Sequence, residues 1–480
     1  MVKFTIILSV ICLCGLPQAH SSLLLPVLDP IYFGLPQPTP ETGLLFNATT
    51  SSGPSTIVFN CSQIIEIALS EPGLTESAKP PSIANMLEGS LPSADSFTEN
   101  RRLRKIYYAA LTPKAVAGYL PVIENVINAY FDNFYSSNEP VQINIAVSAL
   151  FIDIANTLMF GPMTPDQITT WRNLGLIIQF GLLTLPDNNA TSPYQLGMSA
   201  SNTARKLATP LVKAKIAQIK ATGKEPIPTL VGTSLIALKK KGVNLATVRY
   251  QDYVNMAPAL YLMFLAPLLP APALWNLVGT PEFLDALRQE QAVLMATSPN
   301  LGLSQLASLP YLDATFKEQT AGGPFGGVGT AMFRRALQTF EIGGQTIPQG
   351  HFISLENQAC LFQNPDGFDT SFVFTPEAWI DKPSSSSGCP FLKANPPGFI
   401  PFGIGVRQCV GRYLGSTLYR MTLSIALRKG TWTRADNFPV YNPAVAMLNF
   451  TSAPLEPASI PSRACPGMGW WRAQPPRTKK

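Results

Sequence analysis

A cysteine within a glycine-rich segment has the setting best suited to chemistry in this chain. Cys409 lies in PFGIGVRQCVGRYLG, residues 401–415. A cysteine thiolate is a strong electron donor to a haem iron and favours O–O cleavage on the opposite side of the iron. Free amides at the start of a following helix would help to keep that sulfur ionised. The segment therefore predicts that Cys409 is the axial ligand of a haem iron.

The residues around Cys409 suit the same use. Gly403, Gly405 and Gly411 would let the backbone approach a flat porphyrin and adopt positive φ. Phe402 can cover the sulfur, and Arg407 can pair with a haem propionate through its fork of donors. A buried structural cysteine beside a glycine-rich turn is the alternative. The agreement of all these positions at once favours the haem interpretation.

Composition limits other kinds of chemistry. Of the 480 residues, 46% are hydrophobic and 13% are charged, so the chain is expected to be globular, with length for two or three domains. Only His20 and His351 are present, which nearly excludes metal sites that need two or three histidines and leaves only His351 for histidine-based catalysis. The net charge of +6 is spread along the chain, so nucleic acid is not an expected partner.

The N-terminus predicts entry into the secretory pathway. FTIILSVICLCGL follows Lys3, and a small-x-small pattern at 19–21 then suits cleavage, so residues 1–21 are predicted to be a signal peptide. An uncleaved anchor, associating the protein with the endoplasmic reticulum membrane, is the alternative. The next basic residue is Lys79, so the positive-inside rule sends the body, residues 22–480, across the membrane. We expect a single domain in the endoplasmic reticulum lumen, or a secreted protein.

Sequons and cysteines bear on the same location. Asn47, Asn60, Asn189 and Asn449 head N-glycosylation sequons, which predict a glycoprotein. Four cysteines remain outside the leader once Cys409 is set aside, and in an oxidising lumen they could form two disulfides in any of three pairings. Free buried thiols are the alternative. These cysteines are Cys61, Cys360, Cys389 and Cys465.

Apolar spacing predicts a mainly α chain with a small β region. The alternating segment 340–354 predicts a β-hairpin, and residues 22–58 read as an extended lead-in with two strands. The apolar stretch 254–278 contains four prolines, which favours a kinked, buried helix over a membrane span. Glycine-rich 322–329 predicts a loop and 362–400 irregular structure. Helices are expected over 98–134, with a start at Thr112–Pro113, and over 142–184, 203–223, 281–295 and 410–429.

The segment FGIGVRQCVG matches every fixed position of FxxGxRxCxG, the thiolate signature of the cytochrome P-450 family, which the chain resembles over roughly residues 85–450. NRRLRKIYYAALTPKAVAGYLP, LPYLDATFKE and IPQGHFISLENQACLFQNPDGF with FTPEAW are similar to other segments of that family, nearest its sterol- and retinoid-hydroxylating branch. The resemblance implies the cytochrome P-450 fold, haem b with its iron, and a monooxygenase-type oxidoreductase that acts on a hydrophobic small molecule such as a lipid, sterol or isoprenoid.

The same resemblance implies further propionate ligands. Arg104 keeps the position of an arginine in the helix that reaches the propionates, although Asn100 stands where the family has Trp or His. A solvated helix charge is the alternative for Arg104. Arg335, or its neighbour Arg334, is the third candidate.

Departures from the family pattern define the alternatives in function. The family's ExxR motif begins at Glu318, but Ala321 holds its arginine position, and Ala378 replaces a second arginine in PEAW. A buried carboxylate without partners is costly, so we expect Glu318 to bind another cation, to be protonated or to face solvent. Residues 255–278 also lack Ser, Thr, Asp and Glu, which removes acid–base proton delivery by those side chains.

Two alternatives follow from these departures. One is a peroxide-driven or hydroperoxide-rearranging haem-thiolate enzyme, for which peroxide would be the oxidant. The other is a catalytically impaired protein that binds haem or lipid. The family's usual electron donors work on the cytosolic side, so a lumenal location leaves the redox partner open.

Overall fold

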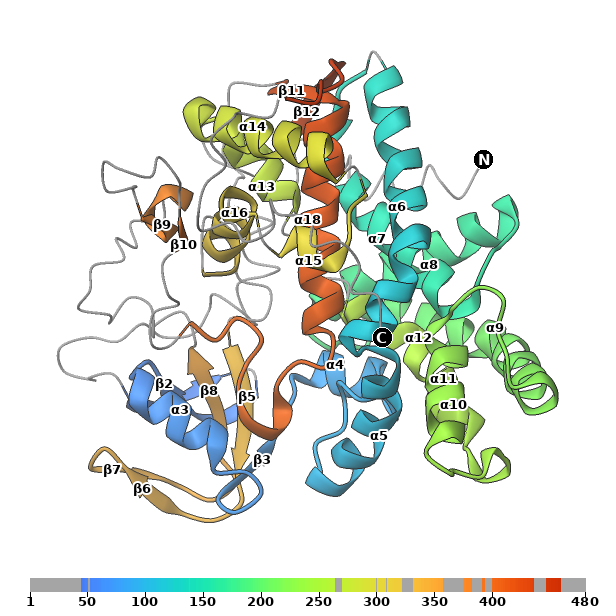
Figure 1. Ribbon diagram of the computed structural model, residues 1–480. Coiled ribbons are helices and arrows are strands. Elements are labelled where there is room, and N and C mark those ends of the chain that lie inside the picture. The colour runs from blue at the N-terminus through green and yellow to red at the C-terminus, as the bar shows by residue number, and fades with distance from the viewer. Residues whose placement is uncertain are drawn as a thin grey trace, which may run out of the picture.

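The computed structural model describes residues 45–50, 52–137, 139–263, 270–298, 300–307, 309–321, 331–356, 374–381, 391–392, 399–435 and 446–458. Helices make up most of it, and a small β region lies to one side (Figure 1). The predicted mainly α architecture with a small β region is confirmed. The predicted leader, the loop over 322–329, most of 362–400 and three of the four cysteines considered for disulfides lie outside the described residues.

Most predicted helices are present, with shifted ends. The α-helices are α3 (Cys61–Leu69), α4 (Pro81–Met86), α5 (Phe97–Ala110), α6 (Pro113–Ser136), α7 (Ile143–Phe160), α8 (Pro165–Leu182), α9 (Pro193–Thr222), α10 (Leu230–Lys240), α11 (Tyr250–Val254), α12 (Met256–Met263), α13 (Pro270–Leu277), α14 (Pro281–Thr297), α15 (Leu303–Leu306), α16 (Pro310–Ala321) and α18 (Arg412–Lys429). Three 3₁₀ turns are η2 (Leu245–Thr247), η4 (Pro376–Trp379) and η5 (Gly405–Arg407).

Capping side chains set the helix boundaries. Thr112 accepts a bond from the backbone N–H of Ala115, and Pro113 occupies the first helical position of α6, as predicted. The segment 142–184 is mostly helical, as predicted, but it is divided into two helices, because α7 ends at Phe160 and the φ of 92° at Gly161 interrupts the helix. Thr164 then forms a capping box that starts α8. Local backbone chemistry therefore overrides the apolar run.

The main sheet has five strands in the order β1-β2-β8-β5-β3, and β2 and β8 pair in parallel. The predicted hairpin is confirmed as β6 and β7, joined at Gly343 and Gly344, both with positive φ. The strands are β1 (Leu45–Thr50), β2 (Gly53–Val58), β3 (Thr75–Ser77), β4 (Val141–Gln142), β5 (Ala331–Ala336), β6 (Phe340–Ile342), β7 (Gln345–Ile347), β8 (Phe352–Glu356), β9 (Ile380–Asp381), β10 (Phe391–Leu392), β11 (Gly430–Arg434) and β12 (Met447–Ser452).

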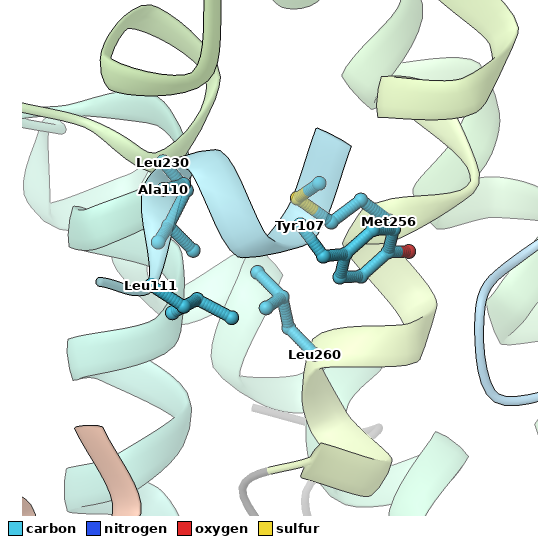
Figure 2. Close-up of a pocket in the computed structure, with 6 residues that line it drawn as sticks. All are labelled: Tyr107, Ala110, Leu111, Leu230, Met256 and Leu260. Atoms are coloured by element: carbon cyan, nitrogen blue, oxygen red, sulfur yellow. The ribbon is translucent and has the colours of Figure 1, made fainter. Parts of the chain in front are cut away.

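The apolar stretch 254–278 contains two short helices, α12 and α13, on either side of residues 264–269, which lie outside the described chain. Their described side chains are almost all buried, as predicted. Met256 and Leu260 of α12 line a narrow apolar pocket with Leu230 of α10 and residues from the end of α5 (Figure 2). The sequences of α12 and α13 contain no Ser, Thr, Asp or Glu that could reach this pocket.

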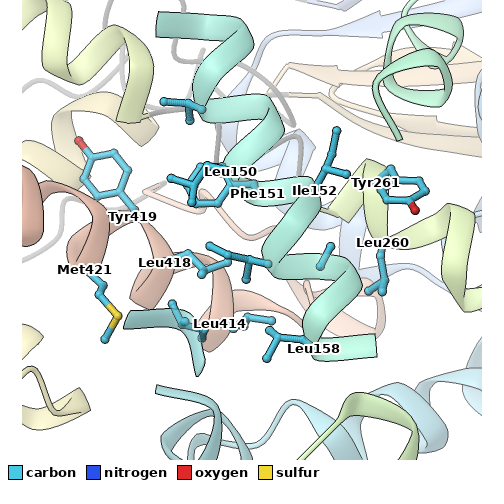
Figure 3. Close-up of a cluster of buried hydrophobic side chains, with 14 of the residues drawn as sticks. Leu150, Phe151, Ile152, Leu158, Leu260, Tyr261, Leu414, Leu418, Tyr419 and Met421 are labelled. Atoms are coloured by element: carbon cyan, nitrogen blue, oxygen red, sulfur yellow. The ribbon is translucent and has the colours of Figure 1, made fainter. Parts of the chain in front are cut away.

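The largest core packs α7 against α18 and α12. Leu150 and Phe151 of α7 lie toward Leu418 of α18, while Ile152 faces Tyr261 of α12 (Figure 3). By length and composition alone α7 could cross a membrane, but 67% of that window is buried inside the protein. Its apolar character is accounted for by packing on several sides. This core fixes the start of α18, which follows Cys409.

Candidate haem-thiolate site

The thiolate loop, residues 400–411, is closed by its own backbone. The N–H of Cys409 donates to the carbonyl of Phe402 at 2.8 Å, and that of Gly403 donates to Ile400 at 2.9 Å. Between them η5 makes a tight turn in which the N–H of Gln408 donates to Gly405 at 3.1 Å. Each of these bonds fixes the place of the sulfur relative to the start of α18.

The glycines of the loop have different roles. Gly403 and Gly405 have φ of 66° and 70°, which confirms the predicted left-handed backbone at both. A Cβ on Gly405 would also lie 3.1 Å from the side chain of Leu69, so the loop packs closely on α3. The prediction is wrong for Gly411, whose φ is −88°. A Cβ there would lie 3.8 Å from the sulfur of Cys409, so Gly411 leaves space beside the sulfur.

The sulfur of Cys409 has the surroundings of a ligand rather than of a packed thiol. Cys409 is free and exposed, yet desolvation by the surrounding protein raises the pKa of its thiol. The residue as a whole is exposed, while enough protein surrounds its sulfur to disfavour the charged form. The backbone N–H of Gly411 and the charges of Arg104 and Arg412 act in the opposite direction and lower the pKa. These groups would stabilise a thiolate.

Arg104 contacts the thiolate loop directly. Its Nη2 donates to the carbonyl of Gln408 at 2.7 Å, and the side chain is only partly exposed. Burial lowers the pKa of Arg104, while the proximity of Cys409 raises it. The alternative that Arg104 is a solvated helix charge is therefore wrong. Its bond to a haem propionate stays a prediction.

Arg407 is already occupied by protein groups. It forms an ion pair with Glu71, whose side chain is fully buried, and its Nη1 donates to the carbonyl of Ala94 at 2.6 Å. Nη2 donates to Glu71 and also to the carbonyl of Asp95. A guanidinium has five N–H donors, so at most one remains. A haem carboxylate would have to share Arg407 with Glu71.

Neighbouring arginines of β5 point in opposite directions, because successive side chains alternate along a strand. Arg335 faces outward, half exposed, with its Nη1 3.9 Å from Glu76. Arg334 is 2% exposed, and its Nε and Nη2 are buried without a hydrogen-bond partner. Only Nη1 donates, to the carbonyl of Phe333 at 2.9 Å. Of the two arginines named as the third propionate candidate, Arg334 rather than Arg335 is therefore the one that faces the interior. Two of its donors lack an acceptor among the described residues.

Lys79 is a third cation near Arg334 and Arg407, and it was not among the residues predicted from the sequence. It follows β3, which pairs with β5, and its Nζ donates to the hydroxyl of Ser77 at 3.0 Å. Burial, together with Arg334 and Arg407, lowers the pKa of Lys79 to about 8. The carboxyls of Glu71 and Asp95 act on Lys79 in the opposite direction and raise its pKa. Only strand pairing brings Lys79 here, so no local signal could have found it.

Glu318 is held by neutral donors. Its Oε1 accepts from the backbone N–H of Thr375 at 2.9 Å, and its Oε2 accepts from the indole N–H of Trp379 at 2.8 Å. The side chain is buried, and burial raises its pKa. The expectations of a substitute cation or of solvent exposure are therefore wrong for Glu318. Although Glu318 lacks the arginine of the ExxR motif, both of its carboxylate oxygens accept hydrogen bonds from other donors.

Comparisons with known proteins agree with this geometry. The cytochrome P-450 family model matches residues 271–445. The chain is 25% identical to cytochrome P-450 87A3 of Oryza sativa subsp. japonica, over 62% of this chain and 56% of that protein. It is 24% identical to cytochrome P-450 26B1 of Danio rerio, over 84% of this chain and 78% of that protein. It is also 30% identical to the mitochondrial 1,25-dihydroxyvitamin D(3) 24-hydroxylase of Rattus norvegicus, over 35% of this chain and 30% of that protein.

Solved structures show the same fold. A retinoic acid-bound cyanobacterial CYP120A1 superposes with a TM-score of 0.65 at 18% identity, covering 86% of this chain and 92% of that one. The haem domain of cytochrome P-450DA superposes with a TM-score of 0.71 at 17% identity, covering 91% and 96%. Over residues 271–445 the chain is similar to the cytochrome P-450 family, and its fold is that of the solved P-450 structures. These similarities support an oxidoreductase with monooxygenase-type activity on hydrophobic small molecules.

The residues present fit a haem. Cys409 is a free cysteine and exposed, and the unpartnered donors of buried Arg334 need an acceptor. Haem carries an iron that takes a thiolate and carboxylates that take guanidinium and ammonium groups. A haem would thus provide both an iron for the thiolate of Cys409 and carboxylates for Arg334.

Proposed function

We propose that this protein binds haem b through Cys409 and hydroxylates a hydrophobic small molecule. Arg334 and Lys79 would hold the carboxylates of the haem, with Arg104 at the thiolate loop and Arg407 shared with Glu71. The proposal rests on two observations. The Nε and Nη2 donors of Arg334 are buried and have no hydrogen-bond partner, and Cys409 is a free, exposed cysteine. The bound haem would supply the activation of oxygen.

The chain itself holds the negative charge on the sulfur. The Gly411 N–H and the charges of Arg104 and Arg412 act on Cys409 and favour its ionised form. Phe402, partly buried, stacks on Phe316 of α16 with ring centroids 6.2 Å apart, which keeps its side of the loop apolar. A dry, charge-stabilised sulfur is what a thiolate ligand requires.

For the substrate we propose an isoprenoid, sterol or related lipid. One relative is named as a vitamin D hydroxylase, and one structure of the same fold is titled as bound to retinoic acid. In this chain the described side chains of α12 and α13 are mostly apolar and buried, which suits an apolar ligand.

The oxidant has two candidates. The family relationship favours dioxygen with electrons from a redox partner. Peroxide is favoured by one observation only, the absence of Ser, Thr, Asp and Glu over 255–278, and the comparisons lend no support to it or to a non-catalytic protein. Turnover with a reductase, compared with turnover with added peroxide, separates the two.

The carbon monoxide difference spectrum of the reduced protein tests the proposal. Wild-type protein is expected to give the Soret band of thiolate ligation, and Cys409→Ala is expected to lose it. Arg334→Leu should retain the thiolate band but bind less haem per chain. Purified protein without haem, or a spectrum unchanged in the Cys409→Ala variant, would overturn the proposal.

We further propose that the protein matures in the secretory pathway. Cys61 is disulfide-bonded, its partner lying outside the described residues, and disulfides persist in oxidising compartments. Asn189 is exposed between α8 and α9, and its Oδ1 accepts from both the N–H and the hydroxyl of Thr191, the third residue of its sequon. Sensitivity of the expressed protein to a glycosidase tests this, and a product of unmodified mass would contradict it.

A further inference from the structure

We propose that Trp379 is a positioning residue for the thiolate ligand. With Glu318 it forms a clamp that joins α16 to the segment around the thiolate loop and takes the place of the arginines that the ExxR and PEAW segments lack. The inference rests on the proposed haem-thiolate function, since its consequence is the position of Cys409.

The clamp is formed by one carboxylate and one turn of backbone. Glu318 lies in the last turn of α16. Its two oxygens accept hydrogen bonds from Thr375, the residue before η4, and from Trp379, the last residue of η4. Trp379 is 1% exposed and Glu318 is 8% exposed. Both oxygens therefore have donors, and the whole contact is shielded from water. Buried bonds of this kind are costly to lose because no water replaces the missing donor.

The cation nearest the clamp, Lys317, faces the ring of Trp379, whereas the charge of Glu377 acts on the carboxylate of Glu318. Nζ of Lys317 lies 5.7 Å from the centre of the indole ring, and Lys317 also pairs with Asp313 at 3.7 Å. Asp313 in turn pairs with Arg420 of α18. Lys317 thus contacts the face of the indole while the N–H at its edge remains for Glu318.

Two contacts connect the clamp to the thiolate loop. The ring of Trp379 packs on Phe399, just before the loop, with centroids 5.1 Å apart. Phe316, two residues before Glu318 on α16, stacks on Phe402, whose carbonyl accepts the N–H of Cys409. Releasing the clamp would free the Trp379–Phe399 contact, whereas Phe316 also packs on Tyr419 and Arg420 of α18, so the thiolate loop would lose one of its two supports.

The test compares two tryptophans in the haem-loaded protein. Trp379→Phe removes the indole N–H and keeps an aromatic ring. Trp432→Phe is the matched control, because Trp432 is 4% exposed and its N–H donates at 2.7 Å to the carbonyl of Leu274, which belongs to neither α16 nor the thiolate loop. The readout is the fraction of carbon monoxide-bound haem that shows thiolate ligation. We expect at least a threefold loss in Trp379→Phe and no loss in Trp432→Phe.

A pH series separates positioning from general damage. In Trp379→Phe the carboxylate keeps only the Thr375 donor, so the thiolate fraction should fall further as pH rises and Glu318 ionises. Adding Glu318→Gln to Trp379→Phe removes the titrating group and should abolish that slope. The other charged or titratable groups around Glu318 are Glu377 of η4, Lys317 and Asp313 of α16, and Tyr419 and Arg420 of α18, and all are unchanged in these variants.

Each outcome decides the question. Wild-type thiolate content in Trp379→Phe, equal losses in both tryptophan variants, or a pH slope that survives Glu318→Gln would overturn the clamp. If Trp379→Phe does not fold, Glu318→Gln alone is measured, since its amide oxygen can keep only one of the two bonds. A smaller loss of the thiolate band without a pH slope is then expected, and an unchanged band would overturn the proposal. Absence of the band in wild-type protein would instead refute the haem-thiolate function.

Discussion

Replacement of Arg407 by methionine separates two roles for this residue, an ion-pair partner of Glu71 and a ligand of the haem. The side chains of Glu71 and Arg407 are 0% and 8% exposed, so the pair is buried. Methionine keeps an unbranched apolar stem but leaves Glu71 without its bidentate partner. Arg334 is the nearest substitute, with its Nε 3.9 Å from Glu71, which is beyond hydrogen-bonding distance.

The expected cost can be worked out from these contacts. Removing one partner of a buried ion pair costs about 3–5 kcal/mol. The carbonyls of Ala94 and Asp95 also lose a donor, at roughly 1 kcal/mol each, while attraction from Arg334 offsets part of the loss. We therefore expect Arg407→Met to lower the free energy of unfolding by about 4 kcal/mol.

A double-mutant cycle with Glu71→Leu supplies the assay. Glu71→Leu removes the buried charge, so the double variant should recover about 2 kcal/mol relative to Arg407→Met, as measured by urea unfolding followed by circular dichroism. Haem per chain is measured on the same samples. If Arg407 also holds a propionate, the double variant regains stability but not haem.

Arg407→Met costing less than about 1 kcal/mol would show that Glu71 finds other partners. A double variant no more stable than the single variant would show that the two side chains are not coupled.

Three further outcomes are expected. Gly405→Ala should destabilise the protein by about 1–3 kcal/mol in thermal or urea unfolding, because the φ of Gly405 is 70° and the new methyl group meets Leu69. Gly415→Ala is the control and should be neutral or slightly stabilising, because a methyl group there meets no other atom. Equal effects of the two substitutions would contradict the strain argument. Burial raises the pKa of Glu290 from 4.5 to about 8, so the folded state binds the proton more tightly and stability is lost as pH rises through that window, by at most about 5 kcal/mol. Glu290→Gln should flatten urea-unfolding curves measured between pH 5 and 8, and an unchanged slope would exclude Glu290. Asn189→Gln should remove one glycan by mass spectrometry, and an unaltered mass would contradict use of that site.

The sequence determined the features that depend on neighbouring residues. Cys409 and its glycines were identified because their spacing is local, and the positive φ of Gly403 and Gly405 follows from the residue type in a tight loop. The start of α6 at Thr112 and Pro113 follows from the same kind of local chemistry. Apolar periodicity similarly fixed the mainly helical class.

The tertiary structure decided the partners of the charged groups. Arg334, rather than Arg335, points into the protein because of the register of β5 against β8, which the sequence does not specify. Lys79 joins the cation cluster only because β3 pairs with β5. Glu71, which occupies Arg407, is more than three hundred residues away in sequence. Long-range pairing of this kind leaves no periodic or local trace.

Glu318 shows the same division most clearly. From the sequence, the alanines at 321 and 378 indicated that its usual cationic partners were missing, and the sequence could say no more than that. The structure supplied two neutral N–H donors from Thr375 and Trp379. A missing charge is visible in a sequence because it is a property of one position. A substitute hydrogen bond is a property of two segments brought together by packing, and only the tertiary structure contains it.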